Sequence, residues 1–173
     1  MKTLITVLFM FYSFCVFSQA FTTQSEWEAY FISATDKLDP IEGIWKITST
    51  MKIYNDNNQL IYTKNDTQIR TKVVYKLNNK FISHTIVGND SYVVMFSNTA
   101  TSNHYLVNIY NKNAFSTAKT TATMTDSGLL EFSYEKPDDL MKYGSGGHHI
   151  IGTIITFEHQ WVKIYPNLQK KHP

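Results

Sequence analysis

The amino-acid sequence predicts an all-β protein: an antiparallel up-and-down β-barrel of about eight or nine strands, with one short amphipathic helix at its N-terminal side. Two observations support this fold class. From Ile44 onward, apolar and polar residues alternate with a period of two, and the alternating runs are separated by short turn clusters such as 55–58 and 126–128. In addition, no long helical segment lies between two runs, so the crossovers that a parallel sheet requires are missing.

Residues 1–20 are typical of a secretory signal peptide. Lys2 supplies the charged start, an apolar run extends from Leu4 to Phe17, and small residues end the segment at Ala20. We therefore expect cleavage near Ala20 and a secreted or periplasmic protein. Cys15 is the single cysteine and leaves with this segment, so neither a disulfide nor thiolate chemistry is expected afterwards. No later apolar run is long enough to span a membrane, so no transmembrane segment is expected in the mature chain.

The rest of the chain divides into an N-terminal helix at 21–37, a barrel domain at 38–166 and a polar tail at 167–173. Without Lys2, fifteen basic residues face fourteen acidic ones, and this balance does not indicate nucleic acid or an anionic membrane as a partner. The helix has the spacing of a capping box, with Thr23 and Glu26. Its apolar stripe must pack on a sheet face or a barrel mouth, and consists of Trp27, Tyr30, Phe31, Ala34 and Leu38.

The strands are expected among ten period-two runs that lie between turn signals, and about eight or nine strands should form from them: 44–54, 59–63, 69–77, 81–87, 92–96, 105–110, 114–124, 129–135, 150–159 and 161–165. The longest loop runs from Lys136 to His149 and contains Gly144-Ser145-Gly146-Gly147. It is the candidate for a lid or rim.

The first strand opens with Gly43-Ile44-Trp45, which resembles the G-x-W signature of lipocalins and the wider calycin group. The resemblance implies that Trp45, with Gly43 before it, is a structural plug that closes the base of the barrel, and that the interior holds a small apolar ligand. Lipocalins usually carry a basic residue near the end of the last strand that stacks on this tryptophan. This sequence departs from that pattern, because its single arginine, Arg70, lies far earlier and Lys163 is a weaker substitute for cation–π stacking. The longer run Leu38 to Trp45 also resembles uncharacterised exported proteins of Bacteroidetes-type bacteria.

Aromatic residues are spread over the predicted strands, and a hollow barrel would use some of them to line its cavity. The candidate ligand-binding residues are Tyr75, Tyr92, Phe96, Tyr105, Phe132 and Tyr134. The sequence alone does not distinguish a hollow interior from a filled one.

The sequence offers little support for other chemistry. His148 and His149, in the glycine-rich loop, are the candidate metal ligands, although adjacent residues of a strand point to opposite faces. No nucleophile-elbow motif occurs, no cofactor motif is present, and no catalytic residue is predicted. We therefore predict an exported binder of a small apolar or amphipathic molecule. The alternatives are a periplasmic or surface module with a filled core that binds a protein or glycan and, more remotely, a hydrolase; the sequence names no protein partner.

Overall fold

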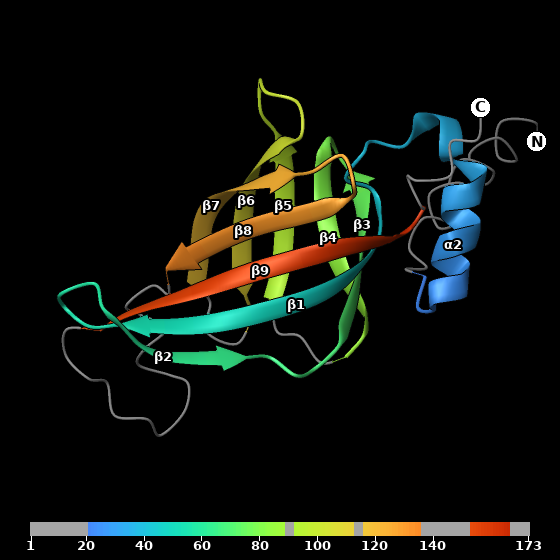
Figure 1. Ribbon diagram of the computed structural model, residues 1–173. Coiled ribbons are helices and arrows are strands. Elements are labelled where there is room, and N and C mark those ends of the chain that lie inside the picture. Colours follow the sequence, from blue (N-terminus) through green and yellow to red (C-terminus); the bar gives the residue numbers. More distant parts are fainter. Residues whose placement is uncertain (1–20, 89–91, 113–115, 136–152, 167–173) are drawn as a thin grey trace, which may run out of the picture.

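The computed structural model describes residues 21–88, 92–112, 116–135 and 153–166, and these form a closed antiparallel β-barrel with one helix on its outside (Figure 1). The helical elements are α2 (Gln24–Ser33) and the short 3-10 helix η2 (Thr35–Lys37). The strands are β1 (Gly43–Tyr54), β2 (Leu60–Asn65), β3 (Arg70–Leu77), β4 (Lys80–Val87), β5 (Tyr92–Asn98), β6 (His104–Asn111), β7 (Ser116–Met124), β8 (Leu129–Glu135) and β9 (Ile154–Tyr165). The predicted fold class is confirmed.

The barrel closes because β1 pairs with the last strand as well as with early ones. Along its whole length β1 is antiparallel to β9, and on its other edge it pairs first with β3 and then with β2. The ring therefore runs β1, β3, β4, β5, β6, β7, β8, β9 and back to β1, and β2 is an extra strand beside the end of β1. The two strands predicted at the C-terminal end are one continuous strand, β9, within the described residues.

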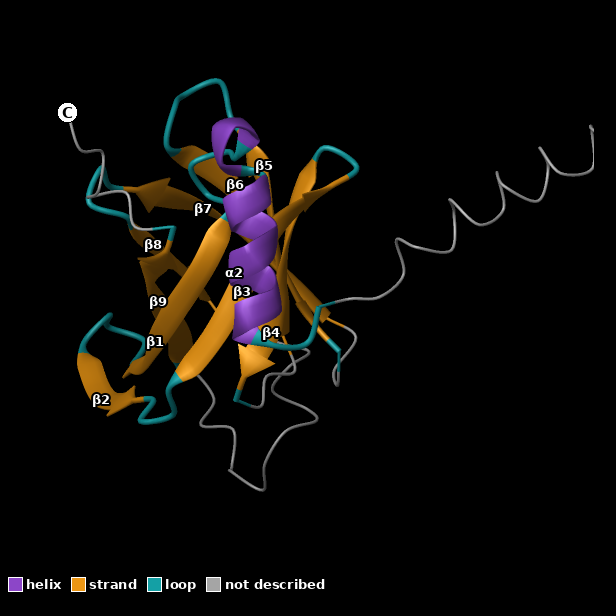
Figure 2. Ribbon diagram, turned by 90° about the vertical axis from the view of Figure 1, so that its right-hand side faces the viewer, coloured by secondary structure: helices purple, strands orange, loops and turns teal. Residues whose placement is uncertain are grey.

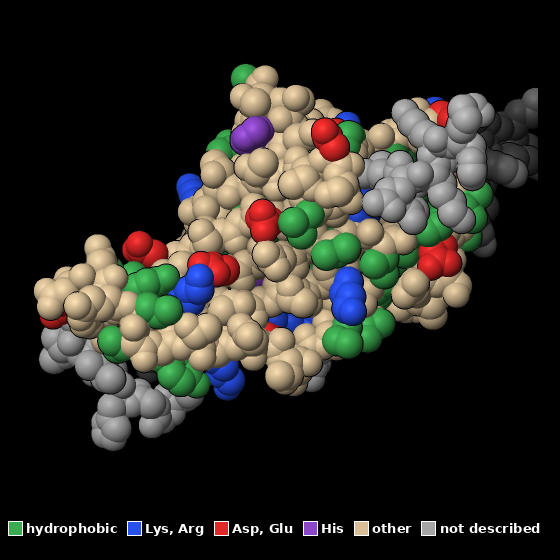
Figure 3. Space-filling view, in the orientation of Figure 1, with side chains coloured by type: hydrophobic (Ala, Val, Ile, Leu, Met, Phe, Trp, Pro, Cys, Tyr) green, Lys and Arg blue, Asp and Glu red, His purple; other side chains and the backbone are tan. Residues whose placement is uncertain are grey.

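Two seams of the ring are short. Within the described residues, β4 pairs with β5 at Phe81↔Phe96 and its neighbour, and β7 pairs with β8 at Met124↔Leu130 and its neighbour. Farther along these seams side chains link the strands, because Thr120 Oγ1 donates to the Ser133 carbonyl at 2.7 Å and the Val94 N–H donates to Ser83 Oγ at 2.9 Å. The outer face of β8, β9 and β1 carries scattered acidic and basic side chains with no patch of a single sign (Figure 3).

The helix α2 packs on the outer surface of the barrel, across β1, β3 and β4 (Figure 2). The predicted capping box is present, because the Thr23 side chain accepts from the Glu26 N–H and the Glu26 carboxylate accepts from the Thr23 N–H. Trp27 and Phe31 are buried from the helix side against Ile44 and Val73 of the barrel. An outward strand face that would ordinarily meet water is thus covered.

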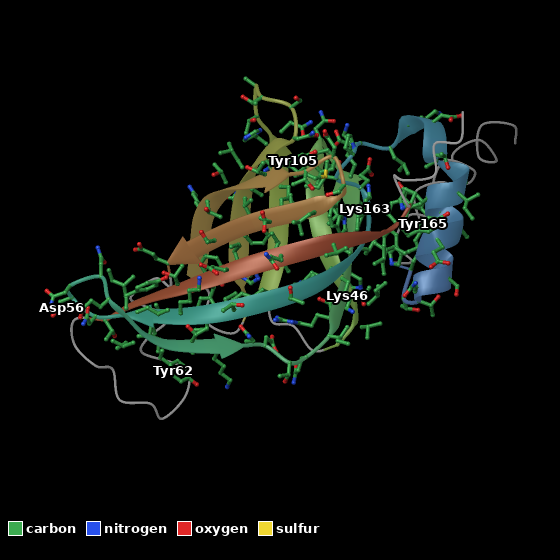
Figure 4. All side chains as sticks on the ribbon, viewed as in Figure 1. Lys46, Asp56, Tyr62, Tyr105, Lys163 and Tyr165 are labelled. Atoms are coloured by element: carbon green, nitrogen blue, oxygen red, sulfur yellow. The ribbon has the colours of Figure 1, made fainter. Side chains whose placement is uncertain are left out.

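The end of the barrel near α2 is closed by the start of β1 and the loop before it. Trp45 is fully buried, and its indole Nε1 donates to the Ile41 carbonyl oxygen at 3.0 Å. The ammonium of Lys163 lies 5.5 Å from the centroid of the Trp45 ring and donates to the Pro40 carbonyl at 2.6 Å. Figure 4 shows Lys163 and Tyr165 at this end, with Asp56 at the opposite tip of the molecule.

The same lysine should make stability depend on pH. Burial lowers the pKa of Lys163 to about 8, although Asp39 and Glu42 act in the opposite direction. Because an unfolded lysine titrates near 10.4, the folded state loses its proton first, and stability should rise between pH 8 and about 10.4. Tyr105, whose pKa is raised by burial and by Asp39, opposes folding only above its normal value near 10.

We expect urea denaturation at pH 7.5 and 9.5 to show this gain as a difference between wild type and Lys163→Met. Relative to the variant, wild type should become more stable by about 2 kcal/mol at the higher pH, since one pKa unit corresponds to about 1.4 kcal/mol. Titrations shared by both proteins cancel in the comparison. A difference that stays constant between the two pH values would contradict the assignment.

Candidate functional site

The barrel interior consists of a filled half and a hollow half. The half near α2 is packed with large side chains, including Trp45, Phe81, Phe96, Tyr105 and Leu130. The other half contains a cavity of about 410 Å³, within the range of small-molecule sites. It is lined by Ile47, Ser49, Met51, Lys64, Asp66, Gln68, Arg70, Lys72, Tyr92, Val94, Ile109, Phe132, Tyr134, Phe157, His159 and Trp161.

One wall of the cavity is a chain of polar contacts across three neighbouring strands. Arg70 of β3 forms an ion pair with Asp66 and donates from Nη2 to the Ser49 hydroxyl of β1 at 3.2 Å. The Ser49 Oγ in turn lies 2.8 Å from the Nδ1 of His159 on β9. Because Ser49 and His159 are directly paired in the β1–β9 ladder, the register of the sheet sets this contact.

The next wall along the ring is aromatic. The His159 ring stacks on Phe132 at a centroid distance of 4.9 Å and on Tyr134 at 5.6 Å, both from β8. Tyr134 also stacks on Phe157 of β9 at 5.5 Å. The lining therefore changes from charged at β3 to aromatic at β8, which is the arrangement that an amphipathic molecule fits.

A buried lysine completes the charged side. Lys72 is 2% exposed and lies two residues after Arg70 on the inward face of β3. Its ammonium donates to the Tyr92 carbonyl oxygen at 2.8 Å. A charged group at this depth needs polar partners, and the carbonyl of β5 is one of them.

The structure places the predicted ligand-binding residues in three different environments. Tyr92, Phe132 and Tyr134 line the cavity. Phe96 and Tyr105 belong to the filled half, where Tyr105 packs against both Phe81 and Phe96. Tyr75 lies outside the barrel, where its ring contacts the Trp27 ring of α2 at a centroid distance of 4.9 Å, so its predicted place in the interior is corrected.

The same physical cause turns Tyr75 outward and turns Arg70 and Lys72, which the sequence analysis did not select, toward the interior. Strand β3 alternates Thr71, Val73 and Tyr75 with Arg70 and Lys72, and the rule that apolar residues face inward would turn both cations toward water. Here α2 covers the outer face, so Val73 is buried there while Arg70 and Lys72 face the interior. The apolar stripe of the helix is the sequence signal that could have revealed this, because such a stripe must cover an apolar strand face.

The hydroxyl of Ser49 and the imidazole of His159 are at the distance at which a serine nucleophile meets its base. However, the same oxygen also accepts from Arg70, and Ser49 is buried. The two contacts hold the Ser49 hydroxyl in the cavity wall, so Ser49 and His159 are interpreted as polar lining of the cavity and not as a catalytic pair.

The predicted metal ligands His148 and His149 lie outside the described residues, and their role stays a prediction. In the described ranges, no three His, Cys, Asp or Glu side chains gather closely enough to hold a metal ion. None of the helices described here has the length and apolarity to cross a membrane.

Together, the fold and the site define a closed antiparallel barrel with a partly hollow, amphipathic interior. No family model matches the sequence, and no curated protein matches it. Among solved structures, the chain is similar to that of EF1p2_mFAP2b bound to DFHBI, with a TM-score of 0.43 and 9% identity over 72% of this chain and 94% of the other. A similarity this low supports no conclusion about this chain, whose fold follows from its own strand pairings.

Proposed function

We propose that this protein is an exported binder of a small amphipathic molecule, which it holds in the hollow half of the barrel. The observation that carries the proposal is the change in lining from Arg70 and Ser49 to Phe132 and Phe157 around one cavity. Small-molecule sites are concave and mostly apolar, with a few placed polar groups. Export is inferred from the signal-like segment at 1–20.

The cavity also weighs against the alternative of a filled-core interaction module. That alternative needs side chains to occupy the interior throughout, whereas the packing around Trp45 and Phe96 is not continued to the other end. The hydrolase alternative rested on the loop histidines, which lie outside the described residues. The contact between Ser49 and His159 does not favour it, because the Ser49 oxygen also accepts from Arg70.

The test is the fluorescence of N-phenyl-1-naphthylamine, an uncharged dye that brightens in apolar surroundings. We expect saturable binding at one dye per chain to the protein without residues 1–20. Ile109→Trp should abolish it, because Ile109 lines the cavity and the larger indole fills it. Leu106→Trp is the matched control, because Leu106 is on the same strand but 51% exposed on the outer surface.

Circular dichroism checks that both variants are folded. If Ile109→Trp is not folded, Val94→Phe takes its place, because Val94 also lines the cavity. Absence of saturable dye binding by the folded wild-type protein would overturn the proposal. Equal dye binding by wild type and by a folded cavity-filling variant would overturn it as well.

A further inference from the structure

We infer that the molecule held in the cavity carries an anionic head group, a carboxylate, and that Arg70, Lys72 and Ser49 bind it while its apolar tail lies on the aromatic wall. This inference rests on the function proposed above and specifies the ligand class. Its basis is the placement of charge inside the barrel.

Most of the charges around the cavity are positive. Among the described lining residues, Lys64, Arg70 and Lys72 are cationic, and Asp66 is the one carboxylate. By contrast, the whole sequence is nearly balanced, with 16 basic and 14 acidic residues. A cavity of this sign favours an anionic occupant, and the low dielectric of a barrel interior strengthens that preference.

One of these positive charges belongs to an arginine. The sequence contains one arginine, and the fold places it in this cavity. A guanidinium presents donors in a planar fork that matches a carboxylate, and hydrogen bonds between ionised partners are stronger than neutral ones. Arg70 already forms an ion pair with the Asp66 carboxylate through Nη2, and Ser49 beside it adds a hydroxyl at the same wall.

The side chains of Arg70 and Lys72 are held in place by neighbouring polar groups. Lys72 is fixed by the Tyr92 carbonyl, and Arg70 is fixed by Asp66 and Ser49. Side chains ordered before binding lose less conformational entropy when the ligand arrives. The cluster is therefore preorganised for a head group.

The aromatic wall provides a surface for the apolar tail. The His159 ring connects the polar wall to Phe132 and Tyr134, so a molecule anchored at Arg70 extends directly onto aromatic surface. Trp161, in the same lining, is 1% exposed, and its indole N–H has no hydrogen-bond partner in the described structure. A buried donor in the wall provides one more polar contact for an occupant.

The test measures displacement of N-phenyl-1-naphthylamine by three compounds with the same decyl tail: decanoate, decan-1-ol and decyltrimethylammonium. Decanoate should displace the dye at a concentration about tenfold lower than decan-1-ol, since charge-assisted hydrogen bonds are stronger than neutral ones. Decyltrimethylammonium should be the weakest of the three. Decyl phosphate, run beside decanoate, distinguishes a carboxylate from a phosphate head group.

Arg70→Met and Lys72→Met should each reduce the preference for decanoate over decan-1-ol to about twofold or less. Lys46→Met is the matched control, because Lys46 carries the same charge on the outer face of β1 and should leave the preference unchanged. If either interior variant fails to fold, the comparison of head groups on the wild-type protein still decides the question.

The outcomes separate the two proposals. If the dye does not bind, the proposed function fails. If the dye binds but decanoate and decan-1-ol displace it equally, or decyltrimethylammonium is strongest, the anionic head group is refuted while the cavity function stands. Tighter binding of decyl phosphate than of decanoate would refute the carboxylate assignment.

Discussion

Gly43→Ala should lower the free energy of unfolding by about 3 to 4 kcal/mol, one of the largest effects expected of a single methyl group in this protein. Gly43 has φ +148°, a conformation that side chains rarely adopt. A Cβ at this position would lie 2.2 Å from the Tyr165 carbonyl oxygen and 2.6 Å from Cε of Lys163. The first of these neighbours is backbone of β9, so relief would require the β1–β9 closure to shift.

Gly88→Ala is the matched control for the backbone conformation alone. Gly88 also has a positive φ, +91°, but the nearest atom to a Cβ there is Cγ of the Arg70 side chain at 3.0 Å. Gly88→Ala should lower the free energy of unfolding by about 1 to 2 kcal/mol, which is the cost of the strained φ without the backbone clash. Urea denaturation followed by circular dichroism measures both. Equal losses for the two variants would show that the clash at Tyr165 contributes nothing.

Much of the fold could be predicted because local signals agreed with it. The turn clusters, the period-two runs and the capping box at Thr23 each specify their own segment, and the ring of antiparallel neighbours follows from short connections. The place of Lys163 over Trp45 also agrees with the resemblance to lipocalins, because the end of β9 pairs with the start of β1. Membership of that family is not shown by these observations.

The candidate site could be predicted only in part, because whether a side chain points into the barrel or out of it depends on what covers the outer face of its strand. Phe132 and Tyr134 face inward in a strand whose outer face is exposed, and alternation places them correctly. On β3 the helix covers the outer face, and the same alternation misplaces Tyr75 and overlooks Arg70. Which aromatic residues fill the interior and which line a cavity depends on packing along the barrel axis, and a strand pattern holds no information on that.

Trp45→Ala should lower the free energy of unfolding by about 4 kcal/mol, because it removes the largest side chain of the closed end and leaves a cavity there. The indole is fully buried and is held by the hydrogen bond to Ile41 and by the Lys163 ammonium. The plug role that the resemblance implies for Trp45 predicts this loss. Urea denaturation of the ligand-free protein, followed by circular dichroism, provides the measurement.

Substitution by phenylalanine separates the hydrogen bond from the volume, and Trp161 provides the matched control. Both indoles are buried in the same barrel, but Nε1 of Trp45 has an acceptor, whereas Nε1 of Trp161 has none among the described residues. Trp45→Phe leaves the buried Ile41 carbonyl without its donor and should cost about 1 to 2 kcal/mol more than Trp161→Phe. Equal costs would mean that Trp45 closes the barrel through its volume alone, and that the hydrogen bond to the loop before β1 adds no stability.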